Sequence, residues 1–254
     1  EYQVTIQKKN FSNKQFTKLS KLNGETAIFI KGKLKKKEII AKEIEILSEN
    51  KKHFSPKLRS KFNIFDSTYT DYIQKNKDFY LRNPKIASVL RFKSKYIFEL
   101  HKYFQERGYT LIEAPIFTER LLYEDKTAFK LEIGNHPIWL SQCCTFQLEP
   151  AINSFEKVYN ITPSFRAEHS KSDRHLSEYT HLKVELAWVN LNDLISISED
   201  LVYYIAKTMS VKWKTEIREL DAEIKIERLK PPYRRITYNE AVNLLNKNGF
   251  KFEW

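Results

Sequence analysis

Charged and aromatic side chains alternate with apolar ones along residues 165–188, FRAEHSKSDRHLSEYTHLKVELAW. Successive side chains of a β-strand point to opposite faces, so this alternation predicts two strands, each with one polar and one apolar face. The first strand would carry Arg166 and Glu168 on its polar face, and a polar loop would follow. The polar face of the second strand would comprise Tyr179, His181, Lys183 and Glu185. Its apolar face would comprise Leu182, Val184, Leu186 and Trp188.

The polar side chains of this hairpin suit a ligand that contains both phosphate and an aromatic ring. Arg166 offers a planar, permanently charged fork for a phosphate or a carboxylate, and Glu168 could accept a hydrogen bond from an exocyclic amine. Tyr179 could stack on a base, while Arg174 and His175 in the loop could meet a triphosphate. Each residue also has a structural alternative: Arg166 could form a surface ion pair with Glu168, which stabilises a protein little. Their combination on one hairpin favours a ligand.

Glycine is scarce in this sequence, which contains five glycines, at positions 24, 32, 108, 134 and 249. Loops that bind phosphate through the backbone, of the Walker or dinucleotide-binding type, need clustered glycines so that the backbone can approach the phosphates. The sequence has no such cluster. We therefore expect side chains, arginine above all, to hold any nucleotide.

The composition is that of a folded and basic chain. Hydrophobic residues make up 41% of its 254 residues and aromatic residues 14%, which excludes disorder of the whole chain. The net charge of +12 favours a polyanionic partner, although a basic surface of no specific role would give the same figure. The sequence shows no membrane-spanning run and no signal peptide, so no membrane partner is expected. Its two cysteines, Cys143 and Cys144, have no metal-binding spacing, which indicates a reducing, cytoplasmic compartment.

The chain is organised into a strand-rich start, a linker and a mixed region. Short strands in residues 1–52 predict part of a small β-barrel, with too few strands to close it. Residues 53–85 are polar without sustained periodicity and are interpreted as a linker or hinge. Residues 86–107 show helical spacing, which Gly108 would end. The order of elements in residues 86–254 favours an α+β domain around an antiparallel sheet.

The same local signals predict further elements. The strands of the partial barrel would be Tyr2–Gln7, Thr26–Lys31 and Ile39–Leu47. Later strands would be Thr110–Glu113, Phe129–Ile133 and Ile138–Leu140. Later helices would be 192–210, capped by Asn192, and 239–248.

Residues 165–179, FRAEHSKSDRHLSEY, resemble motif 2 of the class II aminoacyl-tRNA synthetases in the aspartyl, asparaginyl and lysyl subgroup. ERGYTLIEAPIF at 106–117 is similar to motif 1 of that family. The stretches EKVYNITPSFRAE, EYTHLKVELAW and PPYRRITYNEAV look most like archaeal-type asparaginyl-tRNA synthetases and their asparagine-synthetase-like paralogues. The resemblance runs from about Gly24 to Trp254. It implies the class II antiparallel sheet flanked by helices in residues 86–254, preceded by an OB-fold-like anticodon-binding module, incomplete here, in residues 1–52.

The resemblance also implies roles for individual residues. Arg166 would be the catalytic residue, because it would bind both the α-phosphate of ATP and the carboxylate of the substrate. The other ATP-binding residues would be Glu168 at the adenine amine, Tyr179 stacked on the adenine, and Arg174 and His175 at the outer phosphates. The amino-acid-binding residues would be Glu124, Gln142 and Thr145, together with Arg166. Glu185 would be a ligand of Mg²⁺.

By the same resemblance, the carboxylate of asparagine would attack ATP, with Mg²⁺ as cofactor, and the aminoacyl group would pass from the adenylate to tRNA. Such catalysis is mostly positioning and charge neutralisation, so it needs no side-chain nucleophile. Expected partners are ATP, an amino acid (asparagine or aspartate), tRNA and a second copy of the chain paired through motif 1. The alternatives are an aspartyl-tRNA synthetase, a tRNA-independent asparagine-synthetase-like paralogue, and a non-catalytic nucleotide- or RNA-binding regulatory paralogue.

Several residues depart from the pattern of the family. Thr145 stands where the family usually has glutamine, and Lys183 ends Thr-His-Leu-Lys where the family has Trp-His-Leu-Glu. The loop YEDK at 123–126 replaces Glu-Gly-Gly and keeps Glu124. These departures affect the choice of amino acid more than the binding of nucleotide. Motif 3, with a second ATP-binding arginine, is not in the sequence; we expect the natural chain to continue past Trp254, and a truncated paralogue is the alternative.

Overall fold

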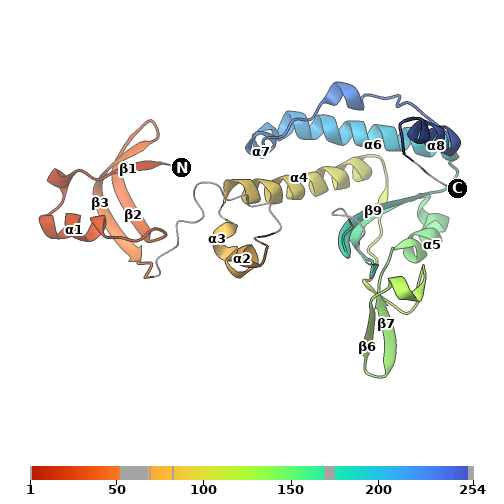
Figure 1. The fold of residues 1–254 in the computed structure, drawn as a ribbon, viewed down its shortest axis with the longest axis horizontal. Coiled ribbons are helices and arrows are strands. Elements are labelled where there is room, and N and C mark those ends of the chain that lie inside the picture. Colours follow the sequence, from red (N-terminus) through yellow and green to blue (C-terminus); the bar gives the residue numbers. More distant parts are fainter. Residues whose placement is uncertain (1, 52–67, 69, 82, 169–174, 251–254) are drawn as a thin grey trace. The chain divides into compact units, whose positions relative to one another are not determined.

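The computed structural model describes residues 2–51, 68, 70–81, 83–168 and 175–250. The chain forms two compact units, residues 1–75 (unit 1) and 76–254 (unit 2), and each is described by itself (Figure 1). Residues 53–67 of the predicted linker lie outside the described residues. The later part of that linker contains two short helices, α2 (Thr70–Lys75) in unit 1 and α3 (Lys77–Tyr80) in unit 2.

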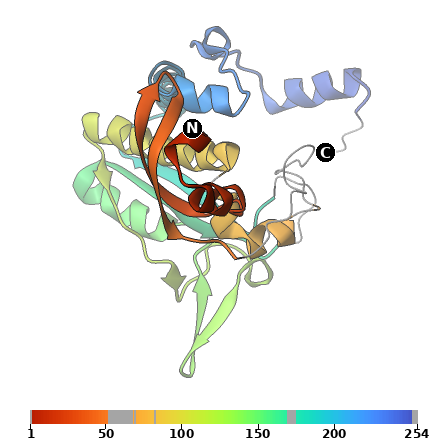
Figure 2. The same ribbon diagram turned by 90° about the vertical axis from the view of Figure 1, so that its left-hand side faces the viewer.

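Unit 1 contains a three-stranded sheet with α1 (Asn13–Ser20) beside it (Figure 2). An antiparallel hairpin of β2 (Ala27–Lys35) and β3 (Glu38–Ser48) makes most of the sheet. On the other edge of β3, the short strand β1 (Gln3–Thr5) runs parallel to it. The three predicted strands are therefore confirmed, and in the described part of unit 1 they do not close into a barrel. Sequence periodicity did not reveal α1, which Ser12 caps with its side chain.

Unit 2 is an α+β arrangement with two three-stranded sheets, in which every strand pair is antiparallel except β4 with β8. The sheet with the order β4-β8-β9 consists of β4 (Thr110–Leu111), β8 (Lys157–Phe165) and β9 (Glu178–Leu186). The sheet with the order β5-β7-β6 consists of β5 (Phe117–Thr118), β6 (Lys130–Ile133) and β7 (His136–Leu140). The α-helices are α4 (Pro84–Glu106), α5 (Thr145–Phe155), α6 (Leu191–Lys212), α7 (Lys214–Glu219) and α8 (Tyr238–Lys247). The chain also has 3₁₀ turns at Lys8–Asn10, Asp125–Thr127 and Ile226–Leu229.

Local signals set both ends of α4. The side chain of Asn83 accepts a hydrogen bond from the backbone N–H of Lys85 (2.9 Å), and Pro84 occupies the first helical position, where its missing N–H costs nothing. At the other end, Gly108 has a φ of +77°, a conformation that glycine adopts without strain. The predicted helix and its glycine stop are confirmed. No helix within the described ranges combines the length and the apolar character needed to cross a membrane.

Two other helices differ from the prediction. The cap of α6 is Asn190, whose side chain accepts hydrogen bonds from the backbone of the next turn, and not Asn192. Helix α5 was not predicted, although Leu148 and its neighbours have helical spacing. Pro150 lies inside this helix, and an internal proline normally signals the end of one.

The core of unit 2 lies between the β4-β8-β9 sheet and the two long helices α4 and α6, which run side by side (Figure 1). Phe104 of α4 is fully buried, and its ring stacks on that of Tyr159 of β8 with the ring centroids 4.7 Å apart. Apolar side chains of β9 pack against this aromatic pair, as the alternation predicted. They are Leu182, Val184 and Leu186. The opposite face of the sheet is covered at one end by α5, through Leu148 and Val158.

Both ends of the predicted hairpin differ from the expected pattern. Strand β8 ends at Phe165, so Arg166 and Glu168 lie after the strand and not on its polar face. The chain departs there because the backbone N–H of Ala167 donates to the carbonyl of Thr127 (3.0 Å), which belongs to a different segment. Trp188 does not belong to the buried apolar face: it lies past the end of β9, is 90% exposed, and has a φ of 62°.

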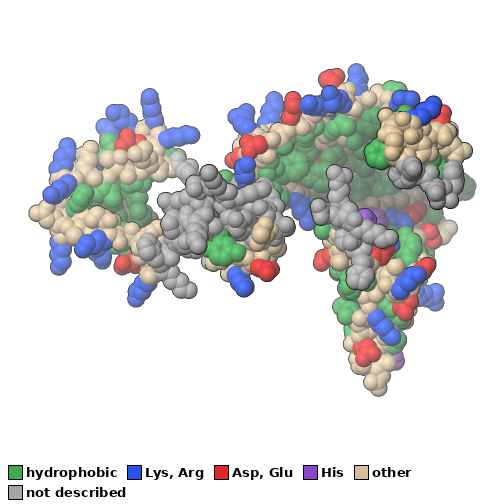
Figure 3. Space-filling view, viewed as in Figure 1, with side chains coloured by type: hydrophobic (Ala, Val, Ile, Leu, Met, Phe, Trp, Pro, Cys, Tyr) green, Lys and Arg blue, Asp and Glu red, His purple; other side chains and the backbone are tan. Residues whose placement is uncertain are grey.

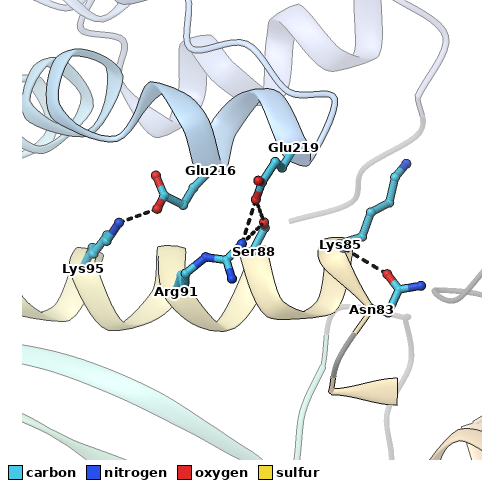
Figure 4. A network of polar contacts seen from close by, with 7 residues as sticks. All are labelled: Asn83, Lys85, Ser88, Arg91, Lys95, Glu216 and Glu219. Carbon is cyan, nitrogen blue, oxygen red and sulfur yellow. Dashed lines mark hydrogen bonds and ion pairs between the residues drawn. The ribbon is translucent and has the colours of Figure 1, made fainter. Parts of the chain in front are cut away.

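Charged side chains join the segment around α7 to α4 (Figure 4). The ion pairs are Lys95 with Glu216, Arg91 with Glu219, and Lys85 with Asp221. Glu216 is the buried member, at 7% exposed, and the ammonium of its partner Lys95 also lies 3.9 Å from the centroid of the Trp213 ring. A buried carboxylate that loses its donor is costly, whereas a solvated pair contributes little. We therefore expect the Lys95–Glu216 pair to contribute more to the stability of unit 2 than the other two ion pairs.

Replacing Glu216 with glutamine should destabilise unit 2 by about 1–3 kcal/mol, because the ammonium of Lys95 then donates to a neutral amide and loses its counter-charge. The matched control is Asp221→Asn in the exposed Lys85 pair, which should change the stability by less than about 0.5 kcal/mol. All four tryptophans lie in unit 2, so urea unfolding followed by tryptophan fluorescence reports its stability. Equal effects of the two substitutions would contradict this account.

The effect of Glu216→Gln should also depend on pH. The hydrogen bond from Lys95 holds the pKa of Glu216 below its ordinary range, against the opposing effect of burial. A carboxyl whose folded pKa is lowered adds stability above its unfolded pKa of about 4.3 and loses that contribution as the pH falls through the folded value. The difference between the wild-type protein and Glu216→Gln should therefore shrink in acid.

Candidate functional site

A row of polar side chains lies on one side of β8 and β9, opposite the aromatic core. Ser164 of β8 pairs with Tyr179 of β9, and its hydroxyl lies 3.0 Å from Nδ1 of His181. Further along β8, the buried amide of Asn160 donates to the carbonyl of Ile112 (2.6 Å), which connects the row to the residue that follows β4. The polar face predicted for β9 is confirmed, and all four of its residues are half-buried. They are Tyr179, His181, Lys183 and Glu185.

Arg166 directly follows β8, at the end of the polar face that carries Ser164 and Tyr179. Its backbone N–H donates to the carbonyl of Ser177 (2.9 Å), which fixes the start of the side chain. The guanidinium lies over the ring of Tyr123, with Cζ 4.2 Å from the ring centroid, and Nη1 lies 3.6 Å from a carboxylate oxygen of Glu168. Nε of Arg166 is buried and has no hydrogen-bond partner within the described part of the chain. Such a planar, incompletely satisfied cation is suited to binding an anion.

Of the other residues expected around a nucleotide, Glu168, His175 and Tyr179 flank the loop of this hairpin. Tyr179 is half-buried, and its ring lies 5.5 Å from that of His181. Partial burial acts to lower the pKa of Arg166, but the phenol groups of Tyr179 and Tyr123 outweigh it and the pKa is raised. Glu168 and His175 are exposed. Arg174 lies outside the described residues.

Gln142, expected to bind the amino acid, is buried and bonded to the 123–127 segment. It is 2% exposed, and both ends of its amide are used inside the protein. Its carbonyl oxygen accepts from the backbone N–H of Tyr123 (3.0 Å), and its amino group donates to the hydroxyl of Thr127 (2.9 Å). Gln142 thus holds the 123–127 segment that places Tyr123 beneath Arg166. Glu124 in the same segment is exposed and forms an ion pair with Lys126 (2.6 Å).

The two residues that depart from the family pattern are in direct contact with each other. Nζ of Lys183 donates a hydrogen bond to Oγ1 of Thr145, the first residue of α5, and lies 3.3 Å from a carboxylate oxygen of Glu185. Burial acts to lower the pKa of Lys183, but Cys143 and Glu185 together raise it above its ordinary value. Lys183 is therefore an ammonium group that joins α5 to β9.

The described residues offer no cluster of protein ligands that could hold a metal ion by themselves. They contain no group of three or more histidine, cysteine, aspartate or glutamate side chains that could hold a metal ion. Glu185, the carboxylate expected to bind Mg²⁺, is paired with the ammonium of Lys183. Mg²⁺ usually takes only one or two protein carboxylates together with water and the phosphates of the substrate, and the ammonium of Lys183 would compete with it for Glu185.

Two residues of the site were not predicted to belong to it. Tyr123 supports Arg166 from a loop more than forty residues away, and no local pattern reveals such a pairing. Asn160 could have been found, because it continues the alternation of polar residues that includes Thr162 and Ser164 toward the start of β8.

Comparison with known proteins identifies relatives over nearly the whole chain. The asparagine–tRNA ligase of Thermoplasma acidophilum is 29% identical over 253 residues, which are 99% of this chain and 58% of that protein. The asparagine–tRNA ligase of Pyrococcus abyssi is 35% identical over 176 residues, 69% of this chain and 41% of that protein. The chain thus spans less than two thirds of the length of either relative.

A solved structure is similar over the whole chain. The asparaginyl-tRNA synthetase of Pyrococcus horikoshii, complexed with asparaginyl-adenylate, superposes with a TM-score of 0.84 at 28% identity. The superposition covers 100% of this chain and 59% of that one. The family described as tRNA synthetases class II (D, K and N) matches residues 70–254, which include the α+β sheet, Arg166 and the polar face of β9. The chain therefore belongs to the class II tRNA synthetases of the D, K and N group.

Proposed function

We propose that the protein to which this chain belongs is an asparaginyl-tRNA ligase, which activates asparagine with ATP and transfers it to tRNA. The observation that carries the proposal is the position of Arg166. Its guanidinium lies over Tyr123 beside the polar face, and its buried Nε has no hydrogen-bond partner among the described residues. The chain that carries it belongs to the class II family. The relatives named above are asparagine–tRNA ligases, and the solved one holds asparaginyl-adenylate, which supports asparagine as the substrate.

In the proposed reaction, an oxygen of the asparagine carboxylate attacks the α-phosphate of ATP, and the bond to pyrophosphate breaks. Arg166 would contact both the α-phosphate and the carboxylate, so it would hold the reacting atoms together and neutralise the charge that develops between them. Tyr179 would stack on the adenine and Glu168 would accept a hydrogen bond from its amine. Arg174 and His175 would meet the outer phosphates.

Residues near the polar face would act on the amino acid. We propose that Glu124 and Thr145 contact it, whereas Gln142 would act indirectly by holding the segment that carries Glu124 and Tyr123. This assignment follows from the burial of Gln142, which is 2% exposed and whose amide is bonded to Tyr123 and Thr127.

Unit 1 would bind tRNA as an anticodon-binding module of the OB type. Its β2–β3 hairpin is rich in exposed lysines, which suit a polyanion. They are Lys31, Lys33, Lys35, Lys36 and Lys37. On the face shown in Figure 3, the blue side chains that project around the sheet and α1 of this unit are lysines. We also propose that the protein pairs with a second copy through residues 106–117.

The test is ATP–pyrophosphate exchange by the full-length protein across a panel of amino acids. Asparagine should stimulate the exchange well above the level without amino acid, and tRNA should then be charged with asparagine. Stimulation by aspartate instead would support an aspartyl-tRNA synthetase or an enzyme that makes asparagine without tRNA. Absence of exchange with either amino acid would refute the proposal.

One observation favours a second candidate, a paralogue that binds nucleotide without activating an amino acid. Lys183 places a cation between Thr145 and Glu185, two residues that a substrate amino group would otherwise approach. Such a paralogue would bind a non-hydrolysable ATP analogue with an affinity that falls in Arg166→Ala, yet show no exchange with any amino acid. Exchange with asparagine would exclude it.

A further inference from the structure

The backbone around Arg166 is fixed by hydrogen bonds, but these bonds do not orient its guanidinium. The backbone N–H of Arg166 donates to the carbonyl of Ser177 (2.9 Å), and that of Ala167 donates to the carbonyl of Thr127 (3.0 Å). Beyond the backbone, an arginine side chain has several rotatable bonds and many accessible rotamers. The orientation of the guanidinium therefore depends on the side chains that surround it.

The side chains of Tyr123, Glu168 and Tyr179 lie around the guanidinium of Arg166. Its Cζ is 4.2 Å from the centroid of the Tyr123 ring, close enough for the ring to attract the cation. A carboxylate oxygen of Glu168 lies 3.6 Å from Nη1, longer than a hydrogen bond, and 51% of the Glu168 side chain is exposed. Tyr179 approaches from β9.

Two of these neighbours have other partners in the proposed complex with ATP. Glu168 would accept a hydrogen bond from the adenine amine, and Tyr179 would stack on the adenine, so both would turn toward the nucleotide. Tyr123 has no assigned contact with the nucleotide, and its ring can stay against the guanidinium while the N–H groups of Arg166 bind phosphate. Tyr123 is therefore suited to hold Arg166 both in the free site and in the occupied one.

Tyr123 is itself held in place by a buried side chain. Gln142, which is 2% exposed, accepts a hydrogen bond from the backbone N–H of Tyr123 (3.0 Å) and donates one to the hydroxyl of Thr127 (2.9 Å). The carbonyl of Thr127 also holds the backbone directly after Arg166. The segment 123–127 thus contacts both the backbone beside Arg166 and its guanidinium, and Gln142 anchors this segment to the interior of unit 2.

We propose that Tyr123 is a positioning residue, whose ring orients the guanidinium of Arg166 before a phosphate binds. This role rests on the proposed function, in which Arg166 contacts the α-phosphate of ATP. An arginine that must be ordered when its ligand arrives weakens binding by about 3- to 10-fold compared with one that is ordered in advance. Tyr123 is 49% exposed, so the protein should fold normally when this ring is replaced.

Binding of α,β-methylene-ATP to the full-length protein tests this role. The analogue cannot release pyrophosphate, so its dissociation constant, measured by isothermal titration calorimetry, does not depend on activation of an amino acid. Tyr123→Leu should weaken binding by about 3- to 10-fold, because the ring that orders Arg166 is lost. Tyr123→Phe keeps the ring, and its dissociation constant should stay within about twofold of the wild-type value.

Tyr203→Leu is the matched control. Tyr203 is also a partly exposed tyrosine with a cation over its ring, Lys207 at 5.8 Å, but it belongs to α6, which packs on the core side of the sheet and not on its polar face. Its replacement should leave the dissociation constant within about twofold of the wild-type value. Equal losses in Tyr123→Leu and Tyr203→Leu would overturn the positioning role.

A double-mutant cycle with Arg166→Ala separates positioning from a general structural effect. If Tyr123 acts through Arg166, Tyr123→Leu should change the affinity of the Arg166→Ala variant for the analogue by less than about twofold. Adenosine, which has no phosphate, should bind Tyr123→Leu as it binds the wild-type protein. An equal loss in both backgrounds, or an equal loss for adenosine, would contradict the positioning role.

The same variants distinguish failure of this role from failure of the proposed function. If Arg166→Ala weakens binding of the analogue and Tyr123→Leu does not, the positioning role alone is wrong. If Arg166→Ala binds the analogue as tightly as the wild-type protein, the phosphate contact of Arg166 is refuted, and the role of Tyr123 with it. A loss in Tyr123→Phe as large as that in Tyr123→Leu would assign the effect to the hydroxyl and overturn the role of the ring.

Discussion

Replacing Arg166 with alanine should lower asparagine-dependent ATP–pyrophosphate exchange by about 10²- to 10³-fold, the usual cost of removing a preorganised donor from a developing charge. The guanidinium is already in place over Tyr123, with Cζ 4.2 Å from the ring centroid, so little reorganisation is needed when a phosphate arrives. Its buried Nε has no partner among the described residues, so a bound anion that accepts a hydrogen bond from it would add to the affinity of the occupied site. The exchange rate is measured in the full-length protein at saturating asparagine.

Two further arginine variants make this expectation specific. Arg166→Lys keeps the charge but loses the planar fork, so its activity should fall between those of the wild-type protein and Arg166→Ala. Arg218→Ala is the control, since Arg218 is an exposed arginine of α7, which packs against α4 and α6. Its loss should leave the exchange unchanged within about twofold. Equal losses in Arg166→Ala and Arg218→Ala would point to general destabilisation.

Strand periodicity predicted the faces of β9 correctly because the alternation of side chains is a property of the extended backbone itself. The side chains of Leu182 and Val184 reach the aromatic core, and those of His181 and Lys183 lie on the other side. The pattern failed at Trp188, where the positive φ ends the alternation, and at Arg166, which follows the last residue of β8. The end of a strand depends on a partner from a distant segment, which periodicity does not encode.

Long-range contacts also explain why the roles of single residues were harder to predict than the elements. The family resemblance placed Gln142 at the substrate, but its amide is buried and bonded to Tyr123 and Thr127. The resemblance also identified Thr145 and Lys183 as two separate departures from the family pattern, and the structure joins them through a hydrogen bond. Such coupling becomes visible only when residues 38 positions apart are brought together by α5 and β9.

Replacing Phe104 with alanine should destabilise unit 2 by about 3–5 kcal/mol, the range for deleting a fully buried aromatic ring from a core. The ring stacks on Tyr159 at 4.7 Å and meets the rings of Tyr103 and Tyr109 edge-on, each with centroids 5.1 Å apart. These contacts hold α4 against β8, whose other side carries Asn160 and Ser164 of the polar face. The folded variant should therefore bind an ATP analogue with normal affinity. A saturating concentration of the analogue should then stabilise the variant against unfolding.

Phe98→Ala provides the matched comparison, because it makes the same chemical change on the same helix at a residue that is 62% exposed. Both substitutions replace phenylalanine with the better helix former alanine, so the gain in helix propensity cancels between them. The difference in unfolding free energy, measured by urea denaturation with tryptophan fluorescence, then reports the burial of Phe104. A difference below about 1 kcal/mol would mean that the aromatic cluster relaxes around the cavity, and that α4 is not held against β8 by this ring.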